Sequence, residues 1–427
     1  MVVSRSLLAQ IFSLDDCGID LCTRPLCCAV DTGMARPKGK GAPGGAGNMR
    51  CSLLTVVLLG ILLSPKANAV SSWPFWDHYA AHFVSPQGRV IDPDQNEMTT
   101  SEGQSYAMFF SLIAGDGNAF EKLRSWTEEN LAQGDLTKNL PAWSWGRKND
   151  GSWGVLDSNS ASDSDLWIAY SLIEAGRLWA KPQYSKTGKT LLSQIAKEES
   201  AVLPQVGTVL LPGRYGFHPD ADHWVVNPSY TPLPLLLAAN QAAPDGPWKS
   251  MATALPVWLR HASPSGFAMD WVEYTADKGF SPVSEPGNSS KSPRGSYDAI
   301  RVYLWAGMTP REAPGSAELL ETFAPMSSYV KTHMAPPEIV APDGTILGTA
   351  APPGFSAAMV PFLLSLGDKE TAAMLLRNVN AQFDPSTQLL GTPSRYYDQN
   401  LALFALGWRE QRFRFDPDGT LRVQWKK

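Results

Sequence analysis

The sequence predicts an all-α fold: a toroid of helical hairpins that forms a single domain over residues 70–427. Apolar residues recur with the 3.6-residue period of a helix in one segment after another. Strand-like alternation is confined to short pieces near 206–211 and 420–425. A fixed repeat of about 34–47 residues is not visible, which disfavours a solenoid. About ten to twelve helices in one domain therefore favour a barrel of helical hairpins.

Two helices stand out in the first half of this domain. Between Tyr106 and Ile113, and again between Leu166 and Ile173, apolar residues fall at i, i+3, i+4 and i+7. Further segments with helical spacing lie near 186–199, 232–240, 249–262, 298–307, 316–333, 356–366, 369–379 and 398–411.

A targeting signal is expected ahead of the domain. Met49 and Arg50 form a short basic start, Leu53–Leu63 is an apolar run, and Ala67–Ala69 offers a small-x-small cleavage site. The run is too short to cross a bilayer, which needs about 20 residues, but it suits the core of a signal peptide. We therefore expect residues 49–69 to be cleaved from a periplasmic or secreted protein.

The cysteines and the tryptophans lie on opposite sides of residue 70. All five cysteines precede residue 70, and all fifteen tryptophans lie at or after Trp73. Residues 1–48 show no periodicity and are expected to be a non-native extension from an upstream start codon, with Met49 or Met34 as the real start. The exported domain then contains no disulfide framework. The six histidines show no ligand spacing, so we expect no metal and no cofactor.

The charge of the domain argues against a nucleic-acid partner. Seven of the 36 Lys and Arg but only four of the 41 Asp and Glu precede residue 70, so residues 70–427 carry a net charge of −8. They contain no cluster of basic residues of the kind that binds phosphates. An acidic surface with many tryptophans suits a neutral ligand on which aromatic rings can stack.

Acidic residues occupy the first turn of three expected helices. In the first, Ser101 is expected to cap the helix, Glu102 is its first residue, and Gln104 completes a capping box.

The second and third helix starts have the same composition. Ser162 is the expected cap of one, with Asp163 and Asp165 at its first and third helical positions. Ser296 is the expected cap of the other, with Asp298 second.

Capping alone accounts for single acidic residues at helix starts, where the helix dipole stabilises each by about 0.3–1 kcal/mol. These three starts, however, are surrounded by Gly, Ser, Asn and aromatic residues instead of the Lys and Glu of a solvated helix. An inner ring of parallel helices would gather the starts at one mouth. Several carboxylates there could protonate and hydrate a glycosidic bond.

Four segments resemble glycoside hydrolase family 8. Residues 161–172 (ASDSDLWIAYSL) resemble the family signature, 100–106 (TSEGQSY) the segment with its general acid, and 296–302 (SYDAIRV) the segment with its general base. Asn227–Tyr230 lies between them in the expected order. The likeness extends over about 73–415, and it is greatest to the periplasmic endoglucanases (cellulases) of bacterial cellulose synthesis operons.

The resemblance implies an (α/α)6 barrel that hydrolyses β-1,4-glucan with inversion of the anomeric centre. It implies that Glu102 is the general acid and Asp298 the general base. The side chains expected to bind substrate are Asp163, Asp165, Tyr230 and Arg301. Arg301, one turn from Asp298, would help to keep that base ionised. For Glu102 the helix dipole acts the wrong way, so burial or the nearby Asp163 must raise its pKa.

Trp143 and Trp145 have two interpretations. They alternate in an extended segment and so share one side, where flat rings could stack on glucose units. Packing in the core is the other interpretation, as for most tryptophans.

Three functions therefore stay open at this stage. The favoured one is an endo-β-1,4-glucanase that trims cellulose near a cellulose synthase complex and works as a monomer. The same fold could act on chitosan, xylan or mixed-linkage glucan, and the net charge of −8 makes cationic chitosan the sharpest rival. A non-catalytic glycan-binding component of cellulose export is the third, although such a protein needs neither Glu102 nor Asp298.

Overall fold

The computed structural model describes residues 73–288 and 290–426. The expected extension (1–48) and signal peptide (49–69) lie outside these residues. In the described part no helix is both long enough and apolar enough to cross a membrane.

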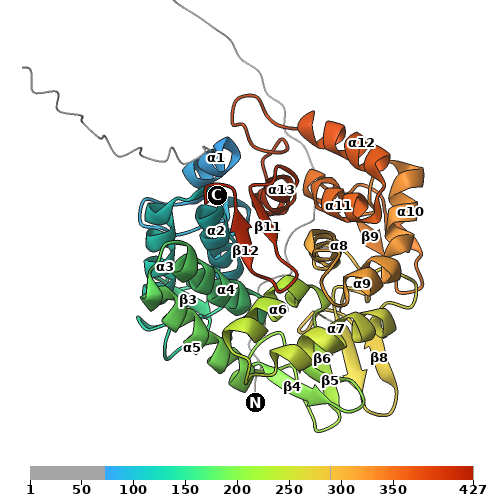
Figure 1. Ribbon diagram of the computed structural model, residues 1–427, viewed down its shortest axis with the longest axis horizontal. Coiled ribbons are helices and arrows are strands. Elements are labelled where there is room, and N and C mark those ends of the chain that lie inside the picture. Colours follow the sequence, from blue (N-terminus) through green and yellow to red (C-terminus); the bar gives the residue numbers. More distant parts are fainter. Residues whose placement is uncertain (1–72, 289, 427) are drawn as a thin grey trace, which may run out of the picture. The chain divides into compact units, whose positions relative to one another are not determined.

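Helices dominate the described residues (Figure 1). The α-helices are α1 (Pro74–Phe83), α2 (Ser101–Ala114), α3 (Gly117–Asn130), α4 (Ser162–Leu178), α5 (Pro182–Glu198), α6 (Leu233–Ala242), α7 (Trp248–Ala262), α8 (Ala299–Met308), α9 (Ser316–Thr322), α10 (Ala324–His333), α11 (Pro353–Leu366), α12 (Lys369–Asn380) and α13 (Tyr396–Arg409). Two short 3-10 helices are η1 (Pro93–Gln95) and η2 (Pro228–Tyr230).

The helices fall into two layers. Nearly every residue of α2, α4 and α8 is buried, and so are most residues of α6, α11 and α13, whereas α3, α5, α7 and α12 bury one apolar face each. In Figure 1 the buried helices lie nearer the centre and the others lie outside them. The outer helices show the one-sided pattern of a surface helix, whereas the inner ones are buried on most sides.

Glycine allows two close approaches between these helices. A Cβ atom on Gly307 in α8 would lie 2.2 Å from the backbone nitrogen of Phe362 in α11. On Gly188 in α5 it would lie 2.7 Å from the carbonyl oxygen of Ala169 in α4. Any larger residue would push these helix pairs apart, so the inner packing depends on both glycines.

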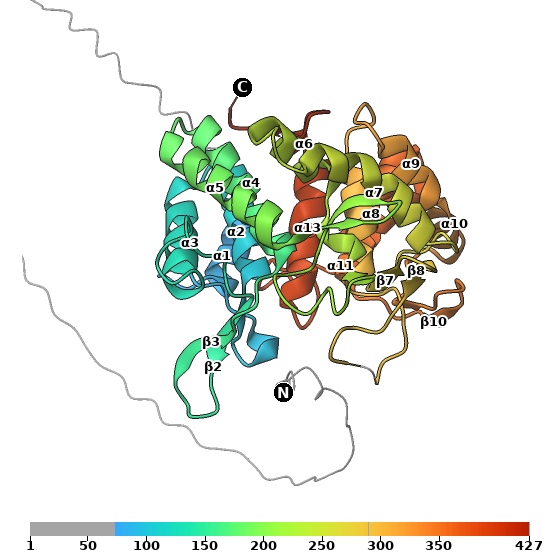
Figure 2. The same ribbon diagram turned by 90° about the horizontal axis from the view of Figure 1, so that it is seen from below.

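Short strands connect the helices and are more numerous than the sequence predicts. They are β1 (Thr99–Thr100), β2 (Ser144–Arg147), β3 (Trp153–Asp157), β4 (Ser200–Leu203), β5 (Gly207–Leu210), β6 (His223–Val226), β7 (Val272–Thr275), β8 (Gly279–Pro282), β9 (Ile339–Val340), β10 (Ile346–Gly348), β11 (Phe413–Phe415) and β12 (Leu421–Val423). All pairs are antiparallel, in the orders β1-β2-β3, β6-β7-β8, β4-β5, β9-β10 and β11-β12. Figure 2 shows β2 and β3 extending away from the helices as a hairpin.

The predicted helix over 316–333 is wrong as one element. It is divided into α9 and α10, with Phe323 ending one and preceding the other. Pro325 occupies the first turn of α10, where its missing N–H is tolerated, whereas inside a continuous helix it would remove a hydrogen bond. The spacing also missed α1 and α3.

Candidate active site

A single buried arginine joins the starts of the inner helices. Arg301 lies in the first turn of α8 and is almost inaccessible to solvent. Its guanidinium nitrogens lie 3.0 Å from Oε2 of Glu102, 2.8 Å from Oδ1 of Asp298, 2.9 Å from Oγ of Ser229, 3.2 Å from Oη of Tyr397 and 3.8 Å from Oδ2 of Asp163. The structure thus brings together four residues that the sequence singled out from α2, α4 and the start of α8.

The carboxylates around Arg301 differ in exposure. The side chains of Glu102 and Asp298 are 23% and 27% exposed, whereas that of Asp163 is 4% exposed. Two carboxyl groups therefore open to solvent, while a third lies beneath them. Such an arrangement can present an acid and a base to a ligand and keep the third carboxylate as a fixed charge.

Burial makes the carboxyl group of Glu102 a weaker acid than usual. Desolvation raises the pKa of Glu102 to about 7; the cation of Arg301 opposes this shift, and the charges of Asp163 and Asp298 add to it. Removal from water therefore outweighs the attraction of the Arg301 cation. A carboxyl group with this pKa holds its proton near neutral pH and can donate it.

Asp270, and not the expected Ser296, caps the start of α8. Oδ1 of Asp270 accepts hydrogen bonds from the backbone N–H groups of Ser296 (2.8 Å), Asp298 (3.1 Å) and Ala299 (2.9 Å). The hydroxyl of Ser296 donates to the carbonyl of Glu338 instead. The cap is thus supplied from a distant loop. Burial, helped by the charge of Asp298, raises the pKa of Asp270 to about 7.

The capping box predicted at Ser101 is also wrong. Thr100 precedes the helix, and its hydroxyl accepts from the N–H of Gly103. Gln104 is buried: its amide accepts from the N–H of Val90 at 2.6 Å and donates to the hydroxyl of Thr127 at 2.9 Å. Its side chain therefore joins distant segments instead of closing its own helix start.

The cap predicted at Ser162 is wrong by one residue. Ala161 precedes α4, and no side chain caps that helix. Oδ1 of Asp163 accepts a hydrogen bond from the backbone N–H of the next residue, Ser164, at 2.7 Å. Burial raises the pKa of Asp163, although Arg301 acts against it.

Asp165 does not reach this group of side chains. It is 0% exposed and lies beside the equally buried Glu199. The structure therefore places the expected ligand Asp165 in the interior, out of contact with solvent.

Aromatic rings continue from Arg301 along one side. The ring of Tyr230, another expected ligand, lies 5.9 Å from the guanidinium carbon of Arg301, and it meets Trp271 edge-on at 6.1 Å. Trp271 in turn stacks on Phe217 at 6.0 Å, with only 7° between the planes.

The tryptophan pair lies toward the hairpin of β2 and β3. Trp145 stacks on Trp153 at 5.3 Å and lies under the guanidinium of Arg89, while Trp153 stays 42% exposed. Trp143 is half-buried, and its carbonyl accepts from the N–H of Ser101 in the first turn of α2. A sugar-binding role for Trp143 and Trp145 stays a prediction.

Three residues of the site are not predicted from the sequence to be functional: Ser229, Asp270 and Tyr397. Ser229 lies within the motif Asn227–Tyr230, which was noticed for its tyrosine. Asp270 and Tyr397 lie in segments without a local signal, since what matters is the distant helix start that each one meets.

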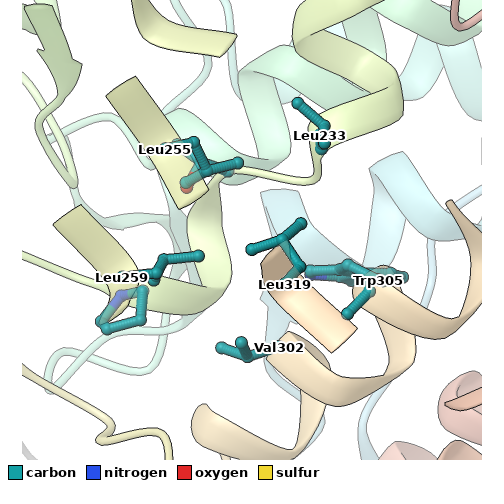
Figure 3. A pocket seen from close by; sticks show the side chains of 9 residues that line it. Leu233, Leu255, Leu259, Val302, Trp305 and Leu319 are labelled. Atoms are coloured by element: carbon teal, nitrogen blue, oxygen red, sulfur yellow. The ribbon is translucent and has the colours of Figure 1, made fainter. Parts of the chain in front are cut away.

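The enclosed cavity behind α8 is not a sugar site. It is lined by Pro228, Thr231, Leu233, Leu255, Leu259, Val302, Trp305, Ala306 and Leu319, and its volume is about 10 Å³ (Figure 3). That is room for one water molecule at most, and the lining is largely hydrocarbon. Among residues 73–288 and 290–426, no group of three or more His, Cys, Asp or Glu side chains could hold a metal ion.

Comparison with known proteins gives a consistent result. Residues 49–411 match the family described as glycosyl hydrolases family 8. The chain is 43% identical over 379 residues to an endoglucanase of Escherichia coli O157:H7, covering 88% of this chain and 97% of that one. It is 44% identical over 372 residues to an endoglucanase of Salmonella typhi, with 87% and 96% covered.

Solved structures agree with these relatives. The endo-1,4-D-glucanase of Vibrio fischeri ES114 superposes with a TM-score of 0.77 at 41% identity, covering 83% of this chain and all of that one. The endo-β-1,4-glucanase CMCax of Acetobacter xylinum superposes with a TM-score of 0.63 at 26% identity, covering 79% and 97%.

Proposed function

Because the chain belongs to glycosyl hydrolase family 8 and is an endo-β-1,4-glucanase, we propose that it cleaves internal bonds of cellulose with inversion, Glu102 acting as general acid and Asp298 as general base. One observation carries the proposal: both carboxyl groups open to solvent while binding opposite nitrogens of one buried guanidinium.

The reaction follows from the states of these two groups. Protonated Glu102 gives its proton to the leaving glycosidic oxygen as that bond breaks. Asp298 accepts a proton from a water molecule, whose oxygen attacks the anomeric carbon from the opposite face. Arg301 keeps a positive charge beside Asp298 while it is the base and beside Glu102 once it has become a carboxylate.

Inversion requires room for a water molecule between Glu102 and Asp298. Retaining enzymes hold their carboxyl groups about 5–5.5 Å apart, and inverting enzymes about 6.5–9.5 Å, which leaves room for the water. A guanidinium whose separate nitrogens bind Glu102 and Asp298 keeps the two groups apart.

We assign the domain to the (α/α)6 barrel type. The inner helices would be α2, α4, α6, α8, α11 and α13, with the remaining helices packed outside them. Several inner helices then begin at one mouth, which accounts for the meeting of Glu102, Asp163 and Asp298.

The biological setting belongs to the same proposal. A signal peptide over 49–69 would deliver a monomeric enzyme to the periplasm or outside the cell, where it would trim cellulose near the synthase complex. N-terminal sequencing of exported protein should then begin within a few residues of Val70. A start before Met49 would contradict this setting without touching the chemistry.

A substrate panel tests the function. Reducing-sugar release should be greatest on carboxymethylcellulose and much lower on xylan and chitosan. Preference for chitosan would mean that the acidic surface selects the substrate. No release from any glycan, with binding retained, would favour the non-catalytic component.

Paired variants test the two roles. Glu102→Gln and Asp298→Asn should each lose about 10²–10⁴-fold in kcat, the usual contribution of a general acid or base. On an activated aryl cellooside, whose leaving group needs no proton, Glu102→Gln should recover much of its rate and Asp298→Asn should not. Equal recovery of both variants would overturn the assignment.

A further inference from the structure

Two carboxyl groups that the proposed mechanism does not use lie side by side in the interior. Asp165 in α4 and Glu199, which follows α5, are both 0% exposed. In the described part of the chain, neither oxygen of Asp165 nor Oε2 of Glu199 has an N–H or O–H partner, and the two carboxyl groups face each other. Two ionised carboxylates in this position would repel each other and leave these oxygens unpaired, whereas one proton lets either group donate to the other.

The charges around the pair favour a single proton. Asp163 adds a negative charge nearby, and Arg214 adds a positive one that is already bound to Glu198 at 2.7 Å. Burial raises the pKa of Asp165 and brings that of Glu199 to about 8. The pair thus keeps at least one proton at neutral pH, and it becomes doubly charged only in alkali.

The pair anchors a loop through Ser160. The hydroxyl of Ser160 donates to Oε1 of Glu199 and accepts from the N–H of Arg214 at 3.1 Å. Next to it, the side chain of Asn159 both accepts from and donates to the backbone of Tyr215. The loop over 212–217 is therefore tied to the segment that leads into α4.

This loop reaches the catalytic group by ring contacts. Phe217 stacks on Trp271, Trp271 meets Tyr230, and Tyr230 lies against Arg301. Tyr215 at the tip is 64% exposed and free to meet a ligand. The position of the loop thus sets one side of the substrate path.

We propose that Asp165 and Glu199 are positioning residues: the proton they share holds Ser160 and the 212–217 loop in the conformation that binds glucan, and its loss releases the loop. The inference rests on the glucanase function and concerns how substrate is held, not the acid and base. Loss of the proton would set two unscreened carboxylates side by side, so that Glu199 turns away from Ser160.

The pH dependence of KM tests the proposal on the intact wild-type enzyme. If only the singly protonated pair binds, the apparent KM for cellopentaose equals the intrinsic value divided by the competent fraction, and it should rise about tenfold by one pH unit above the pKa of the pair. Asp165→Asn keeps a donor toward Glu199 but has no proton to lose, so its KM should stay flat over that range. The alkaline fall of kcat, which belongs to Glu102, should persist in both proteins.

Glu198→Gln is the matched control. It removes the neighbouring, partly exposed partner of Arg214 and should leave the wild-type rise in KM in place. A wild-type KM that stays flat into alkali would overturn the proposal, as would an Asp165→Asn KM that rises like the wild type. Ser160→Ala should have a raised KM at every pH; a native KM would also contradict the proposal. An enzyme inactive on every glucan would instead contradict the proposed function.

Discussion

Replacing Arg301 with glutamine should move the alkaline limit of activity to higher pH. Arg301 is the cation bound to Glu102, Asp298 and Asp163, and it lowers the pKa of Glu102 against the effect of burial. Without it, Glu102 should hold its proton more tightly. The acid form then survives to higher pH, even though the variant is slower.

The size of the shift follows from the geometry. At an effective dielectric constant of about 20, unit charges 3.0 Å apart interact by about 5.5 kcal/mol, equivalent to about four pKa units. This is an upper limit, because the Glu102 side chain is 23% exposed and the charge of Arg301 is shared among three carboxylates. We expect a rise of about one to two units in the pKa of Glu102. The loss in kcat should be at least about 100-fold, since Asp298 and Glu102 both lose a charged hydrogen bond.

The assay is kcat at saturating cellopentaose across the pH range, with melting temperatures to confirm folding. Arg177→Gln is a suitable control, because it breaks the pair with Glu174 near the far end of α4 and should not move the limit. An alkaline limit of Arg301→Gln that is unchanged, or that falls, would refute this electrostatic reasoning.

Other predictions concern the acid, the helix start and the core. In the wild type, kcat/KM should fall as pH rises through about 7, because Glu102 must be protonated to act and its pKa is about 7; full activity above pH 9 would contradict this. Asp270→Ala should lower kcat by about tenfold or more, because it leaves three N–H groups at the start of α8 unpaired and Asp298 loosely held. Asp270→Asn should keep most of the activity. A native kcat in the alanine variant would contradict the positioning role of Asp270. Gly307→Ala should reduce the free energy of unfolding, measured in urea, by about 1–3 kcal/mol, because its Cβ would lie 2.2 Å from the backbone nitrogen of Phe362. An unchanged free energy of unfolding would mean that α8 and α11 can move apart without cost.

The sequence supports predictions where the signal is local. Glu102, Asp163 and Asp298 stand at or near helix starts, and Arg301 follows Asp298 by one turn, so spacing alone places them on related elements. The structure brings all four together. Helical spacing of apolar residues likewise predicts most of the inner helices, among them α2, α4 and α13.

Failures arise where a distant segment supplies the partner. Ser296 looks like a cap, yet Asp270, far away in the sequence, accepts the N–H bonds of that helix start. Gln104 looks like half of a capping box, yet its amide joins Val90 and Thr127. Asp165 shares the motif of Asp163 but points to Glu199, because residues two positions apart lie on nearly opposite faces of a helix.

The stereochemistry of the first product tests the central claim most directly. Proton NMR during the first minutes of cellopentaose hydrolysis, before mutarotation, reports the anomer released at the new reducing end. If Glu102 protonates the leaving oxygen while Asp298 activates a water on the opposite face, the α-anomer must appear first. Initial release of the β-anomer would contradict the account, because it requires a covalent intermediate and a nucleophile in place of a base.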